Sequence, residues 1–309
     1  MAQQEKLKPR LVVIVGPTSI GKTELAIRLA GEWGGEIISA DSMQVYRYMD
    51  IGTAKPTREE ISLVQHHLID VVNPDEIFNA AMFAKNAGEV IEALNHQKKP
   101  VLVVGGTGLY IRALLGGLFE CPDADENLRE FYQAELKSHG KRYLYEKLKL
   151  KDEKAAALIN ENDVIRVIRA IEVMELTGES ILEKQKAHRY GNNLYDCIKI
   201  GMMMERDRLY AQINQRTDKM IADGFTDEVH NLLNMGYDET LKPMQSLGYR
   251  HMVDYLHGTY SLPETIRLIK RDTRRYAKRQ LTWFRADKDI EWFYPKETDA
   301  ILKRIENFL

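Results

Sequence analysis

The spacing of hydrophobic residues predicts an alternation of strands and helices in the first third of the chain. Residues 11–15, LVVIV, form an unbroken apolar run that is typical of a short strand buried on both faces. Shorter runs at 36–40 and 101–104 predict two further strands, and helical spacing at 22–33 and 75–97 predicts the helices between them. This alternation favours an α/β fold with a mostly parallel sheet that is covered on both sides.

The apolar spacing changes after Gly117. From about 122 to 190 the apolar positions recur at helical intervals and no run indicates a strand, which predicts a helical insertion. The remaining expected elements are a returning strand at 195–204 and helices at 206–222, 226–235, 243–257 and 262–285, with Pro243 and Pro263 near helix starts. We therefore predict an α/β core of residues 1–120 and 191–309 and a helical insertion domain of residues 121–190.

The segment between the first strand and the first helix carries a phosphate-binding motif. GPTSIGKT fits G-x-x-x-x-G-K-[ST] and lies, as the motif requires, after an apolar strand and before a helix. In such a loop the backbone N–H groups curl around a di- or triphosphate, ATP among them, a lysine contacts the terminal phosphate and a hydroxyl binds Mg²⁺. The loop predicts a P-loop NTPase-like core but not the reaction. The predicted phosphate ligands are Gly16, Pro17, Thr18, Ser19, Ile20, Gly21, Lys22 and Thr23, with Thr23 as the Mg²⁺ ligand.

Polar residues also follow the second and third strands, at the edge of the sheet where ligands bind in open α/β proteins. Asp41 ends the second strand and is a candidate Mg²⁺ ligand or general base, although a plain loop carboxylate is the alternative. Ser42 and Gln44 are suited to hydrogen-bond the edge of a nucleobase, and Thr107 is a candidate substrate contact. His66 and His67 are adjacent and do not face the same side, so we expect structural roles for them rather than metal binding.

The composition excludes several classes of protein. Of 309 residues 44% are apolar, and the formal net charge is −2, which argues against a disordered chain. The two cysteines, Cys121 and Cys197, are far apart, so a disulfide scaffold is not expected. No apolar run is long enough for a signal sequence or a membrane span, and we expect a cytoplasmic protein.

The even charge balance conceals a strongly basic segment. Residues 265–288 contain nine Lys/Arg and two acidic residues, a charge of +7, so the rest of the chain carries −9. With Tyr276, Trp283 and Phe284 interleaved, this helix suits a nucleic-acid backbone and stacked bases, or else it is a solvated helix whose aromatic residues belong to the core.

Arginines elsewhere leave similar choices open. Arg206 and Arg216 are candidates for stabilising phosphate charge, with ordinary pairing to nearby acids as the alternative. Arg166 and Arg169 form a second basic patch or pair with Asp163 and Glu172.

Seven segments, in order along nearly the whole chain, together resemble one family. They are GPTSIGKT, ISADSMQVYRYMDIGTAKP, HHLID, GGTGLYIRALLGGL, DVIRVIRAIEV, SLGYR and RRYAKRQLTWFR. The chain thus resembles the tRNA dimethylallyltransferases, also called tRNA isopentenyltransferases, in their bacterial form without a zinc-finger extension. Ile20 is a departure, because small residues are common at this position in the family, but the position contributes mainly its N–H.

The resemblance implies a reaction and a set of partners. It implies transfer of the dimethylallyl group from dimethylallyl diphosphate to N6 of adenine 37, next to the anticodon in the tRNA anticodon stem-loop, by a monomer. Asp41 is the implied general base, and Lys22, Thr23 with Mg²⁺, and Arg216 are implied to stabilise the leaving diphosphate. The implied tRNA contacts are Asp41, Ser42, Met43, Gln44, Thr107, Ile165, Arg166, Arg169, Arg274, Arg275, Lys278, Arg279 and Gln280.

Three other functions are compatible with the phosphate loop. A P-loop kinase of a small molecule or nucleotide would use the basic helix as an arginine lid. A tRNA-binding P-loop NTPase would use nucleotide as a switch. A related enzyme that prenylates free adenine nucleotides would have no use for two basic patches.

Overall fold

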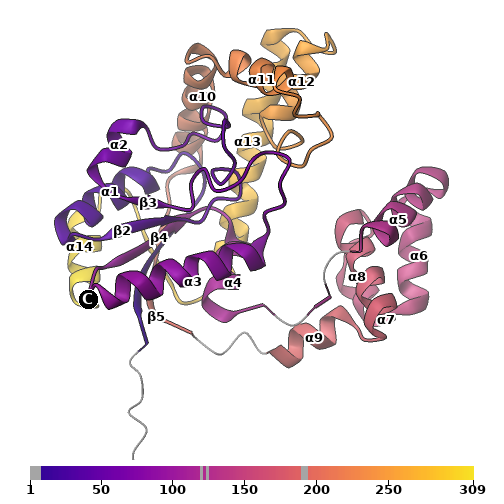
Figure 1. Cartoon of the computed structure of the whole chain (residues 1–309), viewed down its shortest axis with the longest axis horizontal. Helices are drawn as coiled ribbons and strands as arrows, with labels where there is room; N and C mark the ends of the chain where they lie inside the picture. The colour runs from indigo at the N-terminus through magenta and orange to yellow at the C-terminus, as the bar shows by residue number, and fades with distance from the viewer. Residues whose placement is uncertain (1–7, 119–120, 123–124, 189–193) are drawn as a thin grey trace, which may run out of the picture. The chain divides into compact units, whose positions relative to one another are not determined.

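The computed structural model describes residues 8–118, 121–122, 125–188 and 194–309, and it consists of six strands and fourteen helices within those ranges (Figure 1). In chain order the elements are β1 (Arg10–Val15), α1 (Lys22–Trp33), β2 (Glu36–Ser39), α2 (Arg58–Leu63), β3 (His66–His67), α3 (Ala80–His96), β4 (Val101–Gly105), α4 (Gly108–Gly116), α5 (Glu126–His139), α6 (Lys141–Lys151), α7 (Glu153–Leu158), α8 (Val164–Thr177), α9 (Ile181–His188), β5 (Asp196–Met202), α10 (Arg206–Ala222), α11 (Phe225–Asn234), α12 (Tyr249–Leu256), α13 (Leu262–Arg285), β6 (Ile290–Phe293) and α14 (Thr298–Glu306). These elements form two compact units, one of residues 1–115 and 194–309 and the other of residues 116–193.

The first unit is built on one parallel sheet, which confirms the predicted α/β fold with a P-loop NTPase-like core. Its strand order is β3-β2-β4-β1-β5-β6, and every neighbouring pair is parallel. β1 lies inside the sheet, with Leu11 level with Val101 of β4 on one side and with Cys197 of β5 on the other. The chain passes from β1 through α1 to β2 and returns to β4 between them, so the carboxyl ends of these strands lie side by side at one edge.

The sheet separates two hydrophobic cores. Alternate residues of β1 point to opposite faces: Leu11, Val13 and Val15 pack with α3 and α4, whereas Val12 and Ile14 pack with α1 and α14 (Figure 1). All five of these β1 residues are buried, as expected for a strand covered on both sides.

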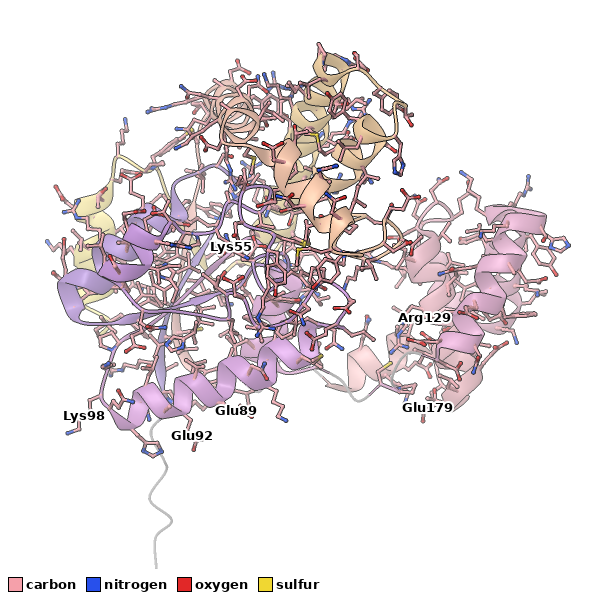
Figure 2. All side chains as sticks on the ribbon, turned by 45° about the horizontal axis from the view of Figure 1, so that its top comes forward. Lys55, Glu89, Glu92, Lys98, Arg129 and Glu179 are labelled. Carbon is pink, nitrogen blue, oxygen red and sulfur yellow. The ribbon has the colours of Figure 1, made fainter. Side chains whose placement is uncertain are left out.

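The helix α3 illustrates how the sequence pattern creates one of these layers. The Asn79 side chain accepts hydrogen bonds from the N–H groups of Ala81 and Met82 and so caps the start of the helix. Its buried positions, Phe83, Ala87, Ile91 and Leu94, recur every three or four residues and face the sheet. Figure 2 shows Glu89 and Glu92 on the outer side of the same helix.

Several predicted elements have different bounds in the structure. The expected helix at 243–257 is shortened to α12, because residues 241–248 form consecutive turns and Gly248, at φ +95°, precedes the first helical residue. Pro243 therefore lies in a turn rather than at a helix start, whereas Pro263 does lie in the first turn of α13. The elements β3, β6, α2, α4 and α14 were not predicted, and each has nine residues or fewer.

The second unit contains the helices α5 to α9 and its own core, so the described part of the predicted insertion is helical. Leu144, Leu148 and Ile171 are fully buried within it. Glu172 is also fully buried, where its carboxylate accepts bonds from Arg129 and Arg169 and from the Asp125 N–H. Figure 2 labels Arg129 on α5.

Two expectations about the chain class can be compared with the structure. Cys121 and Cys197 are both free thiols, as expected for a chain without a disulfide scaffold. Across the described ranges no helix is both long and apolar enough to cross a membrane.

Gly105, the last residue of β4, offers a test of the sheet packing. A Cβ at this position would lie 2.1 Å from the backbone oxygen of Ala40, so Gly105→Ala should lower the free energy of unfolding by roughly 1–3 kcal/mol. Gly31→Ala is the matched control, because it lies in α1 with open space around it, and it should be neutral or stabilising by about 0.5–1 kcal/mol. Urea denaturation measures both, and equal midpoints would contradict the expectation.

Candidate active site

A cavity of about 520 Å³ opens at the carboxyl edge of the sheet. The P-loop (residues 16–23), the loop after β2 and the turn after β4 supply its polar wall. The segment from α10 to α13 supplies the rest of the lining, with the apolar and aromatic side chains of Met220, Phe225, Leu247, Tyr249 and Ile269 beside polar ones such as Arg216 and Thr273. The cavity is therefore suited to a ligand with an anionic end and an apolar or aromatic part.

The P-loop adopts a curled backbone that depends on its glycines. Gly16, Ser19 and Gly21 have φ values of +150°, +64° and +93°, and Gly21 forms the N-cap of α1 with no capping side chain. The first N–H groups of α1 therefore remain available to an anion at the positive end of the helix. The hydroxyl of Ser19 is buried without a hydrogen-bond partner within the protein, so it is suited to bond to a polar ligand in this loop.

Two cations flank this loop. The Lys22 ammonium folds back over it and donates to the backbone oxygens of Gly16, at 3.0 Å, and Pro17, at 2.8 Å. Burial lowers the pKa of Lys22 to about 8, with the charge of Asp41 opposing the shift and that of Arg216 adding to it. Arg216 of α10 donates to the Thr18 hydroxyl at 3.3 Å, and burial lowers its pKa against the opposing charge of Asp41.

The structure distinguishes between the two arginines that the sequence left open. Arg216 lines the cavity, as predicted. Arg206 begins the same helix ten residues earlier, about 15 Å away along the axis, and its exposed guanidinium lies 3.4 Å from Asp207. The interpretation of Arg206 as a phosphate ligand was wrong, and its ordinary pairing to a neighbouring acid is what the structure contains.

Adjacent strand ends bring Asp41 and Thr107 together, and Asp41 lines the cavity whereas Thr107 lies behind the turn that contains Ser42. Asp41 Oδ1 accepts hydrogen bonds from the N–H groups of Met43, at 2.8 Å, and Gln44, at 3.4 Å, which fixes the carboxylate over the turn after β2. The Thr107 hydroxyl accepts a bond from the Ser42 N–H at 3.0 Å and so joins this turn to β4. Asp41, Ser42, Met43 and Gln44 all line the cavity.

Gln280 has a position that sequence reasoning missed. It was predicted among the tRNA contacts of the basic helix, but it is buried, with only 6% of its surface exposed. Its Oε1 accepts a bond from the Thr18 N–H at 2.9 Å, and its Nε2 donates to the Gly106 oxygen at 3.0 Å. Because both ends of the amide are occupied, Gln280 ties α13 to the P-loop, and an RNA contact by this side chain stays a prediction.

The aromatic residues of α13 are divided between the cavity and the core. Tyr276 lines the cavity, where burial and the charge of Asp41 raise the pKa of its hydroxyl above the ordinary value. Phe284 is 3% exposed and belongs to the core, and Trp283 packs beside it beneath the Arg112 guanidinium, at 4.3 Å. For these two rings the structure therefore favours the alternative, that they belong to the hydrophobic core and do not stack on bases.

The predicted RNA-binding cations differ in exposure. Arg275, Lys278 and Arg279 are exposed on α13, whereas Arg274 is half-buried and donates to Asn214 at 2.6 Å. On α8, Ile165 is exposed.

The other two predicted contacts on α8 already have partners within the second unit. Arg166 lies 3.3 Å from Asp163, and Arg169 lies 2.5 Å from Glu172, so both arginines form the ion pairs that were the alternative to a basic patch. Their contact with tRNA stays a prediction.

Oxygen donors suitable for Mg²⁺ are few in the cavity. No cluster of three or more His, Cys, Asp or Glu side chains that could hold a metal occurs in the described part of the chain. The hydroxyl of Thr23 and the carboxylate of Asp41 both line the cavity, and Mg²⁺ characteristically uses one or two protein oxygens together with phosphate oxygens and water. This donor set fits a Mg²⁺ ion that arrives with a diphosphate.

His66 and His67, which the sequence argued were not metal ligands, have hydrogen-bond partners of their own. His66 Nδ1 lies 2.8 Å from the Val64 oxygen, and His67 Nε2 lies 2.6 Å from Glu36.

The parallel sheet, the P-loop and the carboxylate at the adjacent strand end define a P-loop α/β protein with a phosphate-binding cavity. A family model described as IPP transferase matches residues 44–287. The chain therefore belongs to the IPP transferase family.

Similar proteins match nearly the full chain. The tRNA dimethylallyltransferase 2 of Syntrophus aciditrophicus (strain SB) is 57% identical over 302 residues, which cover 98% of this chain and 97% of the relative. A tRNA isopentenylpyrophosphate transferase of Bacillus halodurans has a similar structure, with a TM-score of 0.71 and 42% identity over 97% of this chain and 96% of that one. A eukaryotic dimethylallyltransferase acting on tRNA gives a TM-score of 0.78 and 25% identity over 96% and 77% of the two chains.

The role of Gln280 in shaping the P-loop can be tested by truncation. Gln280→Ala leaves the Thr18 N–H and the Gly106 oxygen without partners, so inorganic diphosphate should bind roughly tenfold more weakly. Titration calorimetry measures the affinity. Thr282→Ala is the control, because this exposed residue on the same helix bonds only to the Lys278 oxygen, and equal affinities of the two variants would rule out the role.

The lowered pKa of Lys22 predicts a pH dependence of anion binding. Below pH 8 the free protein carries the Lys22 charge, whereas above pH 8 the group is neutral and must take up a proton as diphosphate binds. Affinity for inorganic diphosphate should therefore fall above pH 8, by up to about tenfold per pH unit. Calorimetry between pH 7 and 9.5 should find this fall in the wild type and not in Lys22→Met, and a common slope would contradict the assignment.

Proposed function

We propose that this chain transfers the dimethylallyl group of dimethylallyl diphosphate to N6 of adenine 37 in tRNA and releases diphosphate. The names of its relatives support a transferase that acts on tRNA. The observation that carries the proposal is the joining, in one cavity, of a P-loop with two cations, the Asp41 carboxylate and a set of apolar and aromatic side chains. A kinase requires the P-loop but has no use for such side chains where its acceptor would lie, which makes it the weaker candidate.

The proposed chemistry breaks the C1–O bond of the donor and forms a C1–N6 bond. The P-loop N–H groups, Lys22 and Arg216 hold the diphosphate and stabilise the negative charge that its oxygen gains as the electron pair of the C1–O bond moves onto it. Asp41 accepts the proton that N6 loses as it attacks C1. Bound through the Thr23 hydroxyl and the diphosphate oxygens, Mg²⁺ would supply further neutralisation of the leaving group.

The acceptor adenine must leave its stack in the anticodon loop to reach an enclosed carboxylate, as in other enzymes that modify bases. The polar turn that contains Ser42 and Gln44 is suited to the edge of the extruded base. The exposed Arg275, Lys278 and Arg279 are suited to the RNA backbone. We propose action as a monomer, in the cytoplasm where its tRNA substrate lies.

Asp41→Asn tests the assignment of the general base. The amide Oδ1 of asparagine retains the bonds from the Met43 and Gln44 N–H groups, so the turn should persist while the proton acceptor is lost. Turnover should fall by about 10²–10⁴-fold, with little change in the binding of tRNA or diphosphate. The assay follows label from dimethylallyl diphosphate, with Mg²⁺, into unmodified tRNA that has adenines at 36 to 38.

The outcomes of this assay separate the candidate functions. Unchanged turnover in Asp41→Asn would remove Asp41 as the base. Consumption of ATP without label in tRNA would favour a kinase or an NTPase switch, and label in free AMP rather than tRNA would favour the nucleotide-prenylating enzyme.

A further inference from the structure

Glu228, on α11, binds a backbone segment that forms one wall of the cavity. Its Oε2 accepts hydrogen bonds from the N–H groups of Asp50, at 2.8 Å, and Ile51, at 2.7 Å, and its Oε1 accepts one from Gly52 at 3.0 Å. The Tyr249 hydroxyl donates a fourth bond to Oε1 at 2.6 Å. Three successive N–H groups that converge on one oxyanion resemble an anion-binding nest whose anion belongs to the protein itself.

The segment is fixed from several sides. A Cβ at Gly52 would come within 2.3 Å of the Phe225 ring and 2.5 Å of the Tyr249 ring, so the backbone lies flush against both. The Lys55 ammonium holds the following turn, with bonds to the Tyr46 oxygen at 2.7 Å and to the carboxylates of Asp50 and Asp70. Burial and Glu228 raise the pKa of Tyr249 well above its ordinary value, which keeps this hydroxyl a donor.

The same segment determines how Gln44 is presented. Gln44 Nε2 donates to the oxygen of Ala54 at 3.1 Å and lies 3.5 Å from that of Thr53, while its Oε1 accepts from the Ser39 hydroxyl at 2.8 Å. An amide has two hydrogens and two lone pairs; both hydrogens are directed at these two carbonyls and Ser39 occupies one lone pair, so one lone pair of Oε1 remains to accept from a ligand. Its direction is set by the carbonyls of residues 53 and 54, which directly follow the three residues bound by Glu228.

We propose that Glu228 is a positioning residue for the acceptor nucleobase, which seats residues 50–54 and thereby orients the Gln44 amide in the cavity. The inference rests on the proposed function, in that the ligand read by Gln44 is the adenine of tRNA. Glu228 acts through backbone and Gln44 and not on the donor, because its bonds go to residues 50–52 and Tyr249 and not to the P-loop, Lys22 or Arg216. A purely structural role would lower stability and leave the preference for adenine unchanged.

Glu228→Gln is the informative variant, since it preserves size but removes the charge and replaces one acceptor oxygen by an NH₂ group. If that group replaces Oε1 it faces the Gly52 N–H and the Tyr249 hydroxyl, and if it replaces Oε2 it faces the N–H groups of Asp50 and Ile51, so donors oppose it in either orientation. Asp227→Asn is the matched control, because it removes a neighbouring exposed carboxylate in the same first turn of α11.

Two measurements on the full chain test the proposal. Hydrogen exchange should report faster exchange of the Asp50, Ile51 and Gly52 amides in Glu228→Gln, by about ten- to a hundredfold, with no change in Asp227→Asn. Binding assays should report a smaller ratio of affinities for tRNA with adenine at 37 over tRNA with guanine at 37, by about tenfold, while the affinity for inorganic diphosphate stays constant. In the Gln44→Ala background, Glu228→Gln should have no further effect on that ratio.

Each result decides one part of the proposal. Unchanged exchange at residues 50–52 would overturn the seating of the segment. Faster exchange with an unchanged preference for adenine, or full additivity with Gln44→Ala, would overturn the positioning role. Failure of the wild type to transfer label to tRNA, or to prefer adenine at 37, would instead reject the proposed function, and the exchange measurement would still decide whether Glu228 seats the segment.

Discussion

The site depends on the close approach of backbone segments at one edge of the parallel sheet. A Cβ at Gly16 would lie 2.8 Å from the Met202 oxygen, and one at Gly105 would lie 2.1 Å from the Ala40 oxygen. At Gly106 the Gln280 amide would be met at 2.1 Å. Because glycine has no side chain, the P-loop lies at backbone distance from the end of β5, the turn bearing Asp41 lies at backbone distance from β4, and the Gln280 side chain of α13 reaches the backbone at Gly106. Polar groups from the P-loop, the Asp41 turn and α13 thereby face one cavity.

This packing places two cations in a partly enclosed space. Burial disfavours the charged form of both Lys22 and Arg216, and a single carboxylate, Asp41, offsets part of that cost. A diphosphate is negatively charged and has several oxygens that accept hydrogen bonds, so its binding would offset the remaining cost of burying these two cations. The same arrangement that makes the free site electrostatically unfavourable therefore favours binding of the anion and stabilises charge that develops on it.

Backbone N–H groups converge on an anion position at two places in the protein, and the two places differ in what binds there. In the P-loop, N–H groups at the start of a helix are left open to an external phosphate. In residues 50–52, three N–H groups are closed by the internal carboxylate of Glu228. The first gives a binding site and the second gives a rigid wall, because a carboxylate of the protein bonds to all three N–H groups of residues 50–52, whereas no side chain caps the start of α1.

Local patterns in the sequence determined much of the architecture and the chemical character of the site. Apolar runs and helical spacing defined β1, α1, β4, α10 and α13 almost to the residue, because a strand buried on both faces and an amphipathic helix each impose their own period. The phosphate motif and the position of Asp41 after a strand were enough to predict their proximity, because parallel strands share one carboxyl edge.

Only the tertiary structure decided which side chains were free to act. Arg206 and Arg216 are equivalent by sequence, and their roles separate only because the first residue of α10 is exposed to solvent whereas later residues of the same helix line the cavity. The interior position of Gln280 and the bonds of Glu228 to a loop about 177 residues away were likewise beyond sequence reasoning. Local sequence determines the elements through short-range sterics and periodicity, whereas contacts between distant residues arise only when those elements pack.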